Sequence, residues 1–418
     1  MSESDRIGNL STLGRIVRGM LAEDSHTTLL AVCPNSEAVA RAALRAAGLH
    51  DAPAVFAATL NQVDLDGGYT GWTPAEFISF VEQESQQAGL TVPVFVGLDH
   101  GGPWTKDIHF RAGLSFDETF DAAKRSVAAC LDAGYASLHI DATVDPHLEV
   151  EVPLDEVIER TVELMAFSED RRVQLGSDPV AYEVGTEEVH GGMADLDRFG
   201  EFVRRLATNL SARGLSNAWP TFFVGRVGTD LHTSHFDVDA ARSLGAIVRP
   251  YGSVIKGHYT DYVDSPSEYP RVRVGGANVG PEFADAEVRA LDQLCTIEAR
   301  RGTDSGFRAT LRDAVIRSDR WRKWLSPVER GTAFDLLDAA RQEWLIRTGS
   351  RYVWTAPAVV ETRRDLYNNV AESVDADEFV VGEISERIAR YIRAFNLVGF
   401  ATDVSRWLDD SPAESSTD

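Results

Sequence analysis

The feature that most constrains this chain is a repeated alternation between short apolar runs and amphipathic helical patterns. Such alternation is typical of βαβ units, in which parallel strands are buried on both faces and helices connect them. Eight strands that alternate with helices most simply close into a barrel. We therefore predict an α/β fold, a (β/α)8 TIM barrel. The expected strands are Thr28–Val32, Ala54–Thr59, Val92–Leu98, Ser137–Ile140, Val180–Val184, Thr221–Arg226, Ser253–Lys256 and Val272–Ala277.

The helical patterns between these strands strengthen the prediction. Ser36 and Thr73 are good helix caps, and Pro74 suits the first helical position. An open doubly wound sheet is the alternative, but Cys33–Ser36 stands where such a sheet usually has a glycine-rich turn. The expected helices are Ser36–Ala47, Pro74–Ala88, Phe116–Ala133, Leu154–Phe167, Ala194–Ala212 and Val238–Leu244.

The alternation stops near Thr303, so we expect two regions: residues 1–302 as the barrel that carries the active site, and 303–418 as a helical C-terminal extension. In Arg320–Trp324, a basic and aromatic run, the tryptophans are expected to pack inward. The aromatic helices are a candidate interface for a homo-oligomer. Residues 411–418 read as a disordered tail.

Charge and cysteine content narrow the classes of partner and compartment. The formal net charge is −24, and such a surface repels nucleic acid phosphates and anionic lipids. We therefore expect no nucleic acid and no membrane partner, and an anionic substrate would need a local basic pocket. No signal-peptide pattern opens the chain, and three cysteines without close spacing favour a reducing, cytoplasmic location.

Three histidines follow predicted strands. Asp99–His100 ends the third strand, His232 follows the sixth and His258 follows the seventh. Active sites of such barrels lie at the carboxyl ends of the strands, so these side chains are expected to meet there. Three imidazoles can hold zinc and leave a position for substrate. The sequence predicts a divalent metal on His100, His232 and His258, with Asp99 as the catalytic group that moves a proton.

Several alternatives stay open at this metal site. His235 competes with His232 as the third ligand, and His139 is either part of the site or a hydrogen-bonded core histidine. Glu183 is a second catalytic base, a fourth ligand or a partner that orients His232. Imidazole ligands favour Zn²⁺, with Mn²⁺ and Co²⁺ as alternatives.

Other polar residues near the strand ends are candidates for substrate binding. Glycines 67, 68 and 71 surround Tyr69, and this turn either presents backbone N–H groups to a substrate oxygen or needs glycine for its dihedral angles. Lys256 supplies local positive charge. The candidate substrate-binding residues are Asn61, Gln62, Gly68, Tyr69, Lys256, Asp261 and Asn278.

Taken in order, these motifs resemble the subunit of class II D-tagatose-1,6-bisphosphate aldolase usually called noncatalytic. The resemblance extends from about Leu30 to Leu397. Its most specific segments are 61–74, 99–103, 139–142, 185–187, 258–262, 279–281 and 351–354. Two positions depart from the family pattern: Pro34–Ser36 replace its Ser-Ala-His, and Leu98 replaces a glycine.

The resemblance implies class II aldolase chemistry at the C3–C4 bond of a sugar. Relatives include enzymes that epimerise ketohexoses, their phosphates or keto-uronates at C4. Our leading hypothesis is a metal-dependent ketose 4-epimerase that uses retro-aldol and aldol steps. The alternatives are a noncatalytic subunit that stabilises a partner aldolase subunit, and a true class II aldolase.

Overall fold

The computed structural model describes residues 10–148, 151–185, 195–229 and 234–409. Eight parallel strands form a closed barrel in chain order, and β1 pairs with β8 to close it. This arrangement confirms the predicted (β/α)8 barrel. The strands are β1 Leu29–Val32, β2 Ala54–Thr59, β3 Val94–Gly101, β4 Ser137–Ile140, β5 Ala181–Gly185, β6 Phe222–Val224, β7 Val254–Gly257 and β8 Gly276–Val279.

The helices of the barrel begin where the sequence offers capping groups. Ser36 accepts a hydrogen bond from the Val39 N–H, and Thr73 forms a reciprocal capping box with Glu76. The helices between the strands are α2 Glu37–His50, α3 Pro74–Gln87, α4 Asp107–Arg111, α5 Phe116–Asp132, α6 Leu154–Leu175, α7 Leu196–Ala212, α8 Val238–Val248 and α9 Glu268–Arg271.

The prediction of the last strand was wrong by four residues at its start. Val272 closes the short helix α9, and Arg273 takes a left-handed conformation with φ of 62°. Val272 and Val274 are buried within this turn, which explains why an apolar run resembled a strand. Since β8 spans Gly276–Val279, Asn278 lies inside the strand and not after it.

The helix α1 (Thr12–Ala22), which the sequence analysis did not predict, lies at the start of the described chain. Its Leu13 is buried and lines the interior of the barrel together with Leu29 and Ala31 of β1. This helix therefore adds an apolar side chain to the inside of the barrel.

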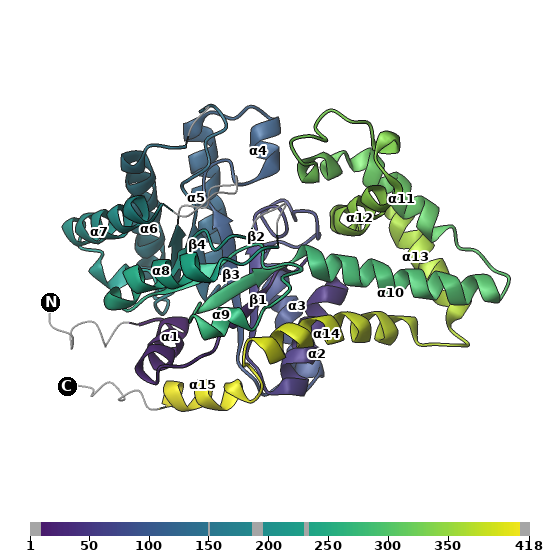
Figure 1. The fold of residues 1–418 in the computed structure, drawn as a ribbon, viewed down its shortest axis with the longest axis horizontal. Coiled ribbons are helices and arrows are strands. Elements are labelled where there is room, and N and C mark those ends of the chain that lie inside the picture. Colours follow the sequence, from purple (N-terminus) through teal and green to yellow (C-terminus); the bar gives the residue numbers. More distant parts are fainter. Residues whose placement is uncertain (1–9, 149–150, 186–194, 230–233, 410–418) are drawn as a thin grey trace.

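The extension consists of helices, as predicted, and short 3-10 segments. Figure 1 shows α11, α12 and α13 grouped along one side of α10, above it in this view, while α14 passes along its other side toward α2 and α15 lies beside α1. From the helix that follows the last strand onward, the elements are α10 Pro281–Arg300, which precedes the extension, and then α11 Phe307–Ser318, η4 Arg320–Trp324, η5 Phe334–Leu336, α12 Ala339–Gly349, η6 Ser350–Tyr352, α13 Pro357–Val370, α14 Ala376–Ala394 and α15 Phe400–Asp409. The predicted disordered tail lies outside the described residues.

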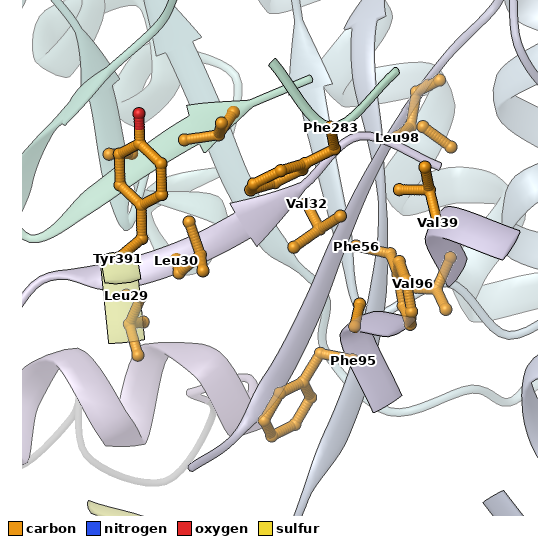
Figure 2. Packing of buried hydrophobic residues seen from close by; sticks show 14 of the residues in the cluster. Leu29, Leu30, Val32, Val39, Phe56, Phe95, Val96, Leu98, Phe283 and Tyr391 are labelled. Atoms are coloured by element: carbon orange, nitrogen blue, oxygen red, sulfur yellow. The ribbon is translucent and has the colours of Figure 1, made fainter. Parts of the chain in front are cut away.

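Barrel and extension share a single apolar core. Figure 2 shows Phe283 of α10 and Tyr391 of α14 beside Leu30 and Val32 of β1, and the rings of Phe283 and Tyr391 lie 6.0 Å apart. The division into two domains at residue 302 stays a prediction. Within the described ranges, no helix is both long and apolar enough to cross a membrane.

Candidate functional site

A cavity of about 260 Å³ lies at the carboxyl ends of the barrel strands, where enzymes of this fold carry their active sites. Two distant parts of the chain line it. The barrel contributes Cys33, Asn35, Thr59, Asn61, Gln62, Tyr69, Asp99, His100, Trp104, Thr105, Asp107, Asp141, Val144, His258, Tyr259, Asp261, Asn278, Gly280 and Pro281. The extension contributes Arg320, Lys323, Trp324, Arg351 and Tyr352 from η4 and η6.

Asp99 and His100 lie at an irregularity in the longest strand. Between Leu98 and Gly101 the register of β3 against β4 shifts by one residue, which is a β-bulge. His100 has a φ of 52°, a left-handed conformation that is unfavourable for most side chains. The bulge places both Asp99 and His100 on the cavity, although neighbouring residues of a regular strand point to opposite faces.

Four side chains converge in what we term the histidine cluster, made up of Asp99, His100, His139 and His258. Each offers one potential ligand atom, and these atoms lie within 4.8 Å of one another. The Nε2 atom of His139 is buried and has no hydrogen-bond partner among the described residues. Imidazoles and a carboxylate are suitable ligands for a divalent transition metal. The cluster therefore fits a divalent metal ion.

The carboxylate of Asp141 orients the imidazole of His100. Its Nδ1 atom lies 2.7 Å from Asp141 Oδ2. A carboxylate bound to one ring nitrogen fixes the orientation of the ring and directs the other nitrogen toward a metal. The sequence analysis included Asp141 only in the motif segment 139–142 and gave it no role. The structure assigns it a positioning contact.

Asp99 is buried and hydrogen-bonded on both oxygens. Its Oδ2 accepts a hydrogen bond from Asn278 Nδ2 at 3.1 Å, and its Oδ1 lies 3.2 Å from His139 Nδ1. Burial favours a raised pKa for this carboxyl, but the charges of His100 and His258 outweigh burial and hold the pKa of Asp99 well below its ordinary value. A charged carboxylate lining a cavity can accept a proton from a substrate hydroxyl.

Glu183 and Lys256 form a buried ion pair beneath the histidine cluster. Lys256 Nζ lies 2.5 Å from Glu183 Oε2, and His258 Nε2 lies 2.8 Å from Glu183 Oε1. Burial favours a raised pKa, yet Lys256 reverses that effect and lowers the pKa of Glu183 to about 2. Both residues line the barrel interior and not the cavity. The structure therefore places Glu183 in contact with the predicted ligand His258, and Lys256 outside the cavity.

The structure brings five of the seven predicted substrate-binding residues together around the cavity. These are Asn61, Gln62, Tyr69, Asp261 and Asn278. Gly68 does not line it, and its N–H donates to Asp66 Oδ1. A Cβ at Gly68 would lie 2.2 Å from the Gln62 carbonyl oxygen, so this turn needs glycine for its own geometry. His232 lies outside the described residues, and its competitor His235 is exposed.

The sequence analysis missed or left open three kinds of site residue. His139 belongs to the histidine cluster, although its alternation within a strand also suited a core histidine. Asn35 joins the site through its Oδ1, which accepts hydrogen bonds from Gln62 Nε2 and the Tyr69 hydroxyl at 3.0 Å each. The basic side chains of the extension were the third kind. The tryptophans of η4 are buried as predicted, but Arg320 and Lys323 of the same segment line the cavity.

Asp261 holds the start of α10 in place. Its Oδ1 accepts hydrogen bonds from the backbone N–H groups of Gly280 and Glu282, at 3.1 and 2.7 Å. Burial is the main reason that the pKa of Asp261 is raised to about 7. This carboxyl therefore changes charge near neutral pH.

Comparison with known proteins gives a match over most of the chain. Residues 16–395 match the family model described as D-tagatose-1,6-bisphosphate aldolase subunit GatZ/KbaZ-like. A D-tagatose 6-phosphate 4-epimerase from Agrobacterium fabrum is 30% identical over 289 residues, which cover 64% of this chain. The aligned region spans 66% of the length of that relative.

Solved structures share the fold. A probable tagatose 6 phosphate kinase from Sinorhizobium meliloti superposes with a TM-score of 0.72 at 22% identity, covering 88% of this chain and all of the other. Fructose-bisphosphate aldolase from Campylobacter jejuni gives a TM-score of 0.56 at 11% identity, covering 94% of this chain and 97% of the other. At these identities the likeness concerns the barrel architecture alone.

Proposed function

The chain belongs to the D-tagatose-1,6-bisphosphate aldolase subunit GatZ/KbaZ-like family, and from this premise we propose that it is a metal-dependent enzyme that epimerises a ketohexose, or a derivative of one, at C4. The observation that carries the proposal is the histidine cluster on a cavity at the catalytic end of the barrel. The name of the Agrobacterium relative supports the same reaction.

His100, His258 and a third imidazole would hold the metal. His139 is the third imidazole of the described cluster, and His232 remains the candidate from the sequence. When bound, a divalent ion supplies Lewis-acid polarisation of a ketose carbonyl and its neighbouring hydroxyl. Imidazole ligands favour Zn²⁺ over Mn²⁺ and Co²⁺ as the native ion.

Asp99 is the proton carrier in this proposal. It accepts the proton of the C4 hydroxyl while the C3–C4 bond breaks, so that C4 becomes an aldehyde and the electron pair of the broken bond stays with C3 and the neighbouring C2 carbonyl as an enediolate. The aldehyde turns over within the cavity and presents its other face, and the C3–C4 bond forms again. Asp99 then returns the proton to the C4 oxygen, so that atoms and charges balance over the cycle. Asn278, which donates to Asp99, keeps one carboxylate oxygen in place.

The polar side chains around the cavity would hold the two halves of the sugar during this turnover. Asn35, Gln62 and Tyr69 are already linked by hydrogen bonds, so their donors and acceptors are arranged before substrate binds. Glu183 acts as a positioning group in the proposal, because it contacts His258 and not the cavity. Its role resembles that of the carboxylates that orient metal-bound histidines.

The test is to purify the protein, measure its metal content, and follow C4 epimerisation of D-tagatose, D-fructose, their 6-phosphates and tagaturonate by NMR. The proposal expects interconversion of at least one pair of C4 epimers, lost on chelation and restored by a divalent metal. Absence of epimerisation with every substrate in metal-loaded protein would exclude it.

The family description itself favours a second function, that of a stabilising subunit of an aldolase. Mixing the protein with a shorter class II aldolase would then raise the rate or the thermal stability of that aldolase. A true aldolase would instead release dihydroxyacetone phosphate, which a coupled triose assay detects. Stabilisation or activation of the aldolase without C4 epimerisation would favour the subunit function. Release of dihydroxyacetone phosphate without C4 epimerisation would favour the aldolase function.

A further inference from the structure

One polar group of the cavity has no role in the reaction as described so far, the hydroxyl of Tyr352 at the end of η6. Its oxygen accepts two hydrogen bonds, from Trp324 Nε1 at 3.1 Å and from Arg351 Nη2 at 2.9 Å. Among the described residues, none accepts a hydrogen bond from this hydroxyl in return. Because both lone pairs of its oxygen are engaged, the hydroxyl can contact a ligand only as a hydrogen-bond donor.

The ring of Tyr352 is fixed in the wall of the cavity. The guanidinium groups of Arg320 and Arg351 lie over it, at 4.3 and 4.5 Å from its centroid. The ring of Tyr69 meets it edge to face, with 5.2 Å between the two centroids. The Tyr69 hydroxyl in turn donates to Asn35 Oδ1 on the barrel side of the cavity. The Tyr352 hydroxyl is therefore held in place before a substrate binds, as a group that stabilises developing charge must be.

The charges around Tyr352 make its hydroxyl a stronger donor. Burial favours a raised pKa, but three neighbouring cations outweigh burial and hold the pKa of Tyr352 below its ordinary value. These cations are Arg351, Lys323 and Arg320, and the charge of Asp107 opposes them only in part. A more acidic phenol forms a stronger hydrogen bond to an oxygen that gains negative charge. The hydroxyl therefore suits a carbonyl oxygen that becomes an alkoxide during the reaction.

We propose that the Tyr352 hydroxyl donates a hydrogen bond to the C4 oxygen of the turned aldehyde, and so holds the aldehyde while the new C3–C4 bond forms. This inference rests on the proposed function. The electron pair at C3 forms the bond to C4, and the π pair of the aldehyde moves onto the C4 oxygen. Asp99 delivers the proton that it holds to that oxygen. Tyr352 keeps its own proton throughout and stabilises the charge that develops on the oxygen.

The C2 carbonyl is a less suitable partner for this hydroxyl. In the proposed function the C2 carbonyl and the C3 hydroxyl are served by the histidine cluster, whose four residues belong to the barrel. Tyr352 belongs to the extension, and within the described ranges no hydrogen bond or ring contact joins it to the cluster. The aldehyde is the half of the sugar that moves, so a donor outside the cluster is available to it.

The test follows the epimer and the free aldehyde together, in the metal-loaded full chain and in Tyr352→Phe, with a sugar that the wild type epimerises. Without the donor, the aldehyde should add back more slowly and escape more often. We expect kcat for epimerisation to fall about 100-fold, and the ratio of released three-carbon aldehyde to epimer to rise at least about 10-fold. NMR measures the epimer, and a coupled triose assay measures the aldehyde. An unchanged kcat with an unchanged ratio would overturn the proposal.

Tyr367→Phe is the matched control. The Tyr367 hydroxyl also accepts hydrogen bonds from a guanidinium, that of Arg363, but Tyr367 does not line the cavity. This variant should keep the kcat and the ratio of the wild type. If Tyr352→Phe lowers kcat without raising the ratio, the hydroxyl has only a structural role and the proposal fails.

Fluorotyrosine at position 352 provides a second readout, and it replaces Tyr352→Phe if that variant does not fold. It keeps the shape of the side chain and makes the hydroxyl more acidic. Only the protonated phenol can donate, so the loss of kcat at high pH should move to a lower pH than in the wild type. An unshifted pH profile would contradict the proposed hydrogen bond.

Calorimetric titration with D-glyceraldehyde separates this proposal from the proposed function, because it does not depend on catalysis. The wild type and Tyr367→Phe should bind this aldehyde, and Tyr352→Phe should bind it at least about 5-fold more weakly. If no sugar is epimerised but this difference appears, the proposed function fails and the hydrogen bond to the aldehyde stands. Equal affinity in all three proteins, or no binding by the wild type, contradicts the hydrogen bond.

Discussion

The histidine cluster and what we term the extension wall, made up of Arg320, Lys323, Arg351 and Tyr352, meet at the same cavity but are built in different ways. The cluster comes from β3, β4 and the residue after β7, and its imidazoles and carboxylates contact one another directly. The wall comes from two 3-10 segments far along the chain, and its cations stack on aromatic rings. In the function we propose, the barrel supplies the reacting groups, and the extension supplies a basic wall of the same cavity. The predictions below test that division.

The largest effect is expected from His100→Ala, because it removes one of the imidazoles that we propose to hold the metal. We expect loss of bound metal and a fall in activity of at least about 1,000-fold on phosphorylated and unphosphorylated sugars alike. Metal analysis and NMR of both substrates check this. His26→Ala, at an exposed position, is the control. If His100→Ala retains all of its bound metal, His100 is not a ligand and other residues hold the ion.

Asp99→Asn should separate proton transfer from metal binding. We expect kcat to fall by about 100- to 10,000-fold, because a group that moves a proton contributes that much, while bound metal is retained. Stopped assays of kcat beside metal analysis measure both quantities. If Asp99→Asn keeps its activity, Asp99 is not the group that moves the proton. The histidine cluster would then not differ from the extension wall in supplying the reacting group.

Glu183→Gln should act on stability, because it leaves the buried Lys256 without its counter-charge. We expect a loss of about 3 kcal/mol in the free energy of unfolding, measured with urea. The double variant Glu183→Gln with Lys256→Met should recover part of that loss, since no uncompensated charge remains. If the single variant is as stable as the wild type, the ion pair has no structural role.

The smallest effect concerns pH. The pKa of Asp261 is raised to about 7 in the folded protein, from an unfolded value near 4. Its contribution to stability is therefore fully present below about pH 4 and is lost as the pH rises through 7. Asp261→Asn should reduce the decline of the melting temperature between pH 5 and 8. An unchanged slope would show that Asp261 is charged throughout this range.

The sequence predicted the barrel and part of the site for one physical reason: parallel strands bring their carboxyl ends to a common edge. That rule alone predicts that Asp99, His100 and His258 lie close together. It could not detect the bulge that turns both Asp99 and His100 to the cavity, because a bulge depends on pairing with β4. It also could not separate His139 from a core residue, since both interpretations predict a buried histidine.

The extension wall could not be predicted because its position depends on tertiary packing. In η4 the buried tryptophans alternate with charged residues, and only the packed structure shows which cations face the cavity. The prediction of the last strand failed for a related reason, because burial by tertiary packing does not require a strand. Val272 and Val274 looked like a strand because they are apolar, but they are buried in a turn.

The most direct test of the account follows the hydrogen at C4. Metal-loaded protein is incubated with D-tagatose 6-phosphate in D2O, and the product is examined by NMR. The account predicts D-fructose 6-phosphate that keeps its original hydrogen on C4, because the bond that breaks is C3–C4 and only the hydroxyl proton moves to Asp99. Deuterium at C4, or no conversion by fully metal-loaded protein of D-tagatose 6-phosphate or of any other sugar tested for C4 epimerisation, would contradict it.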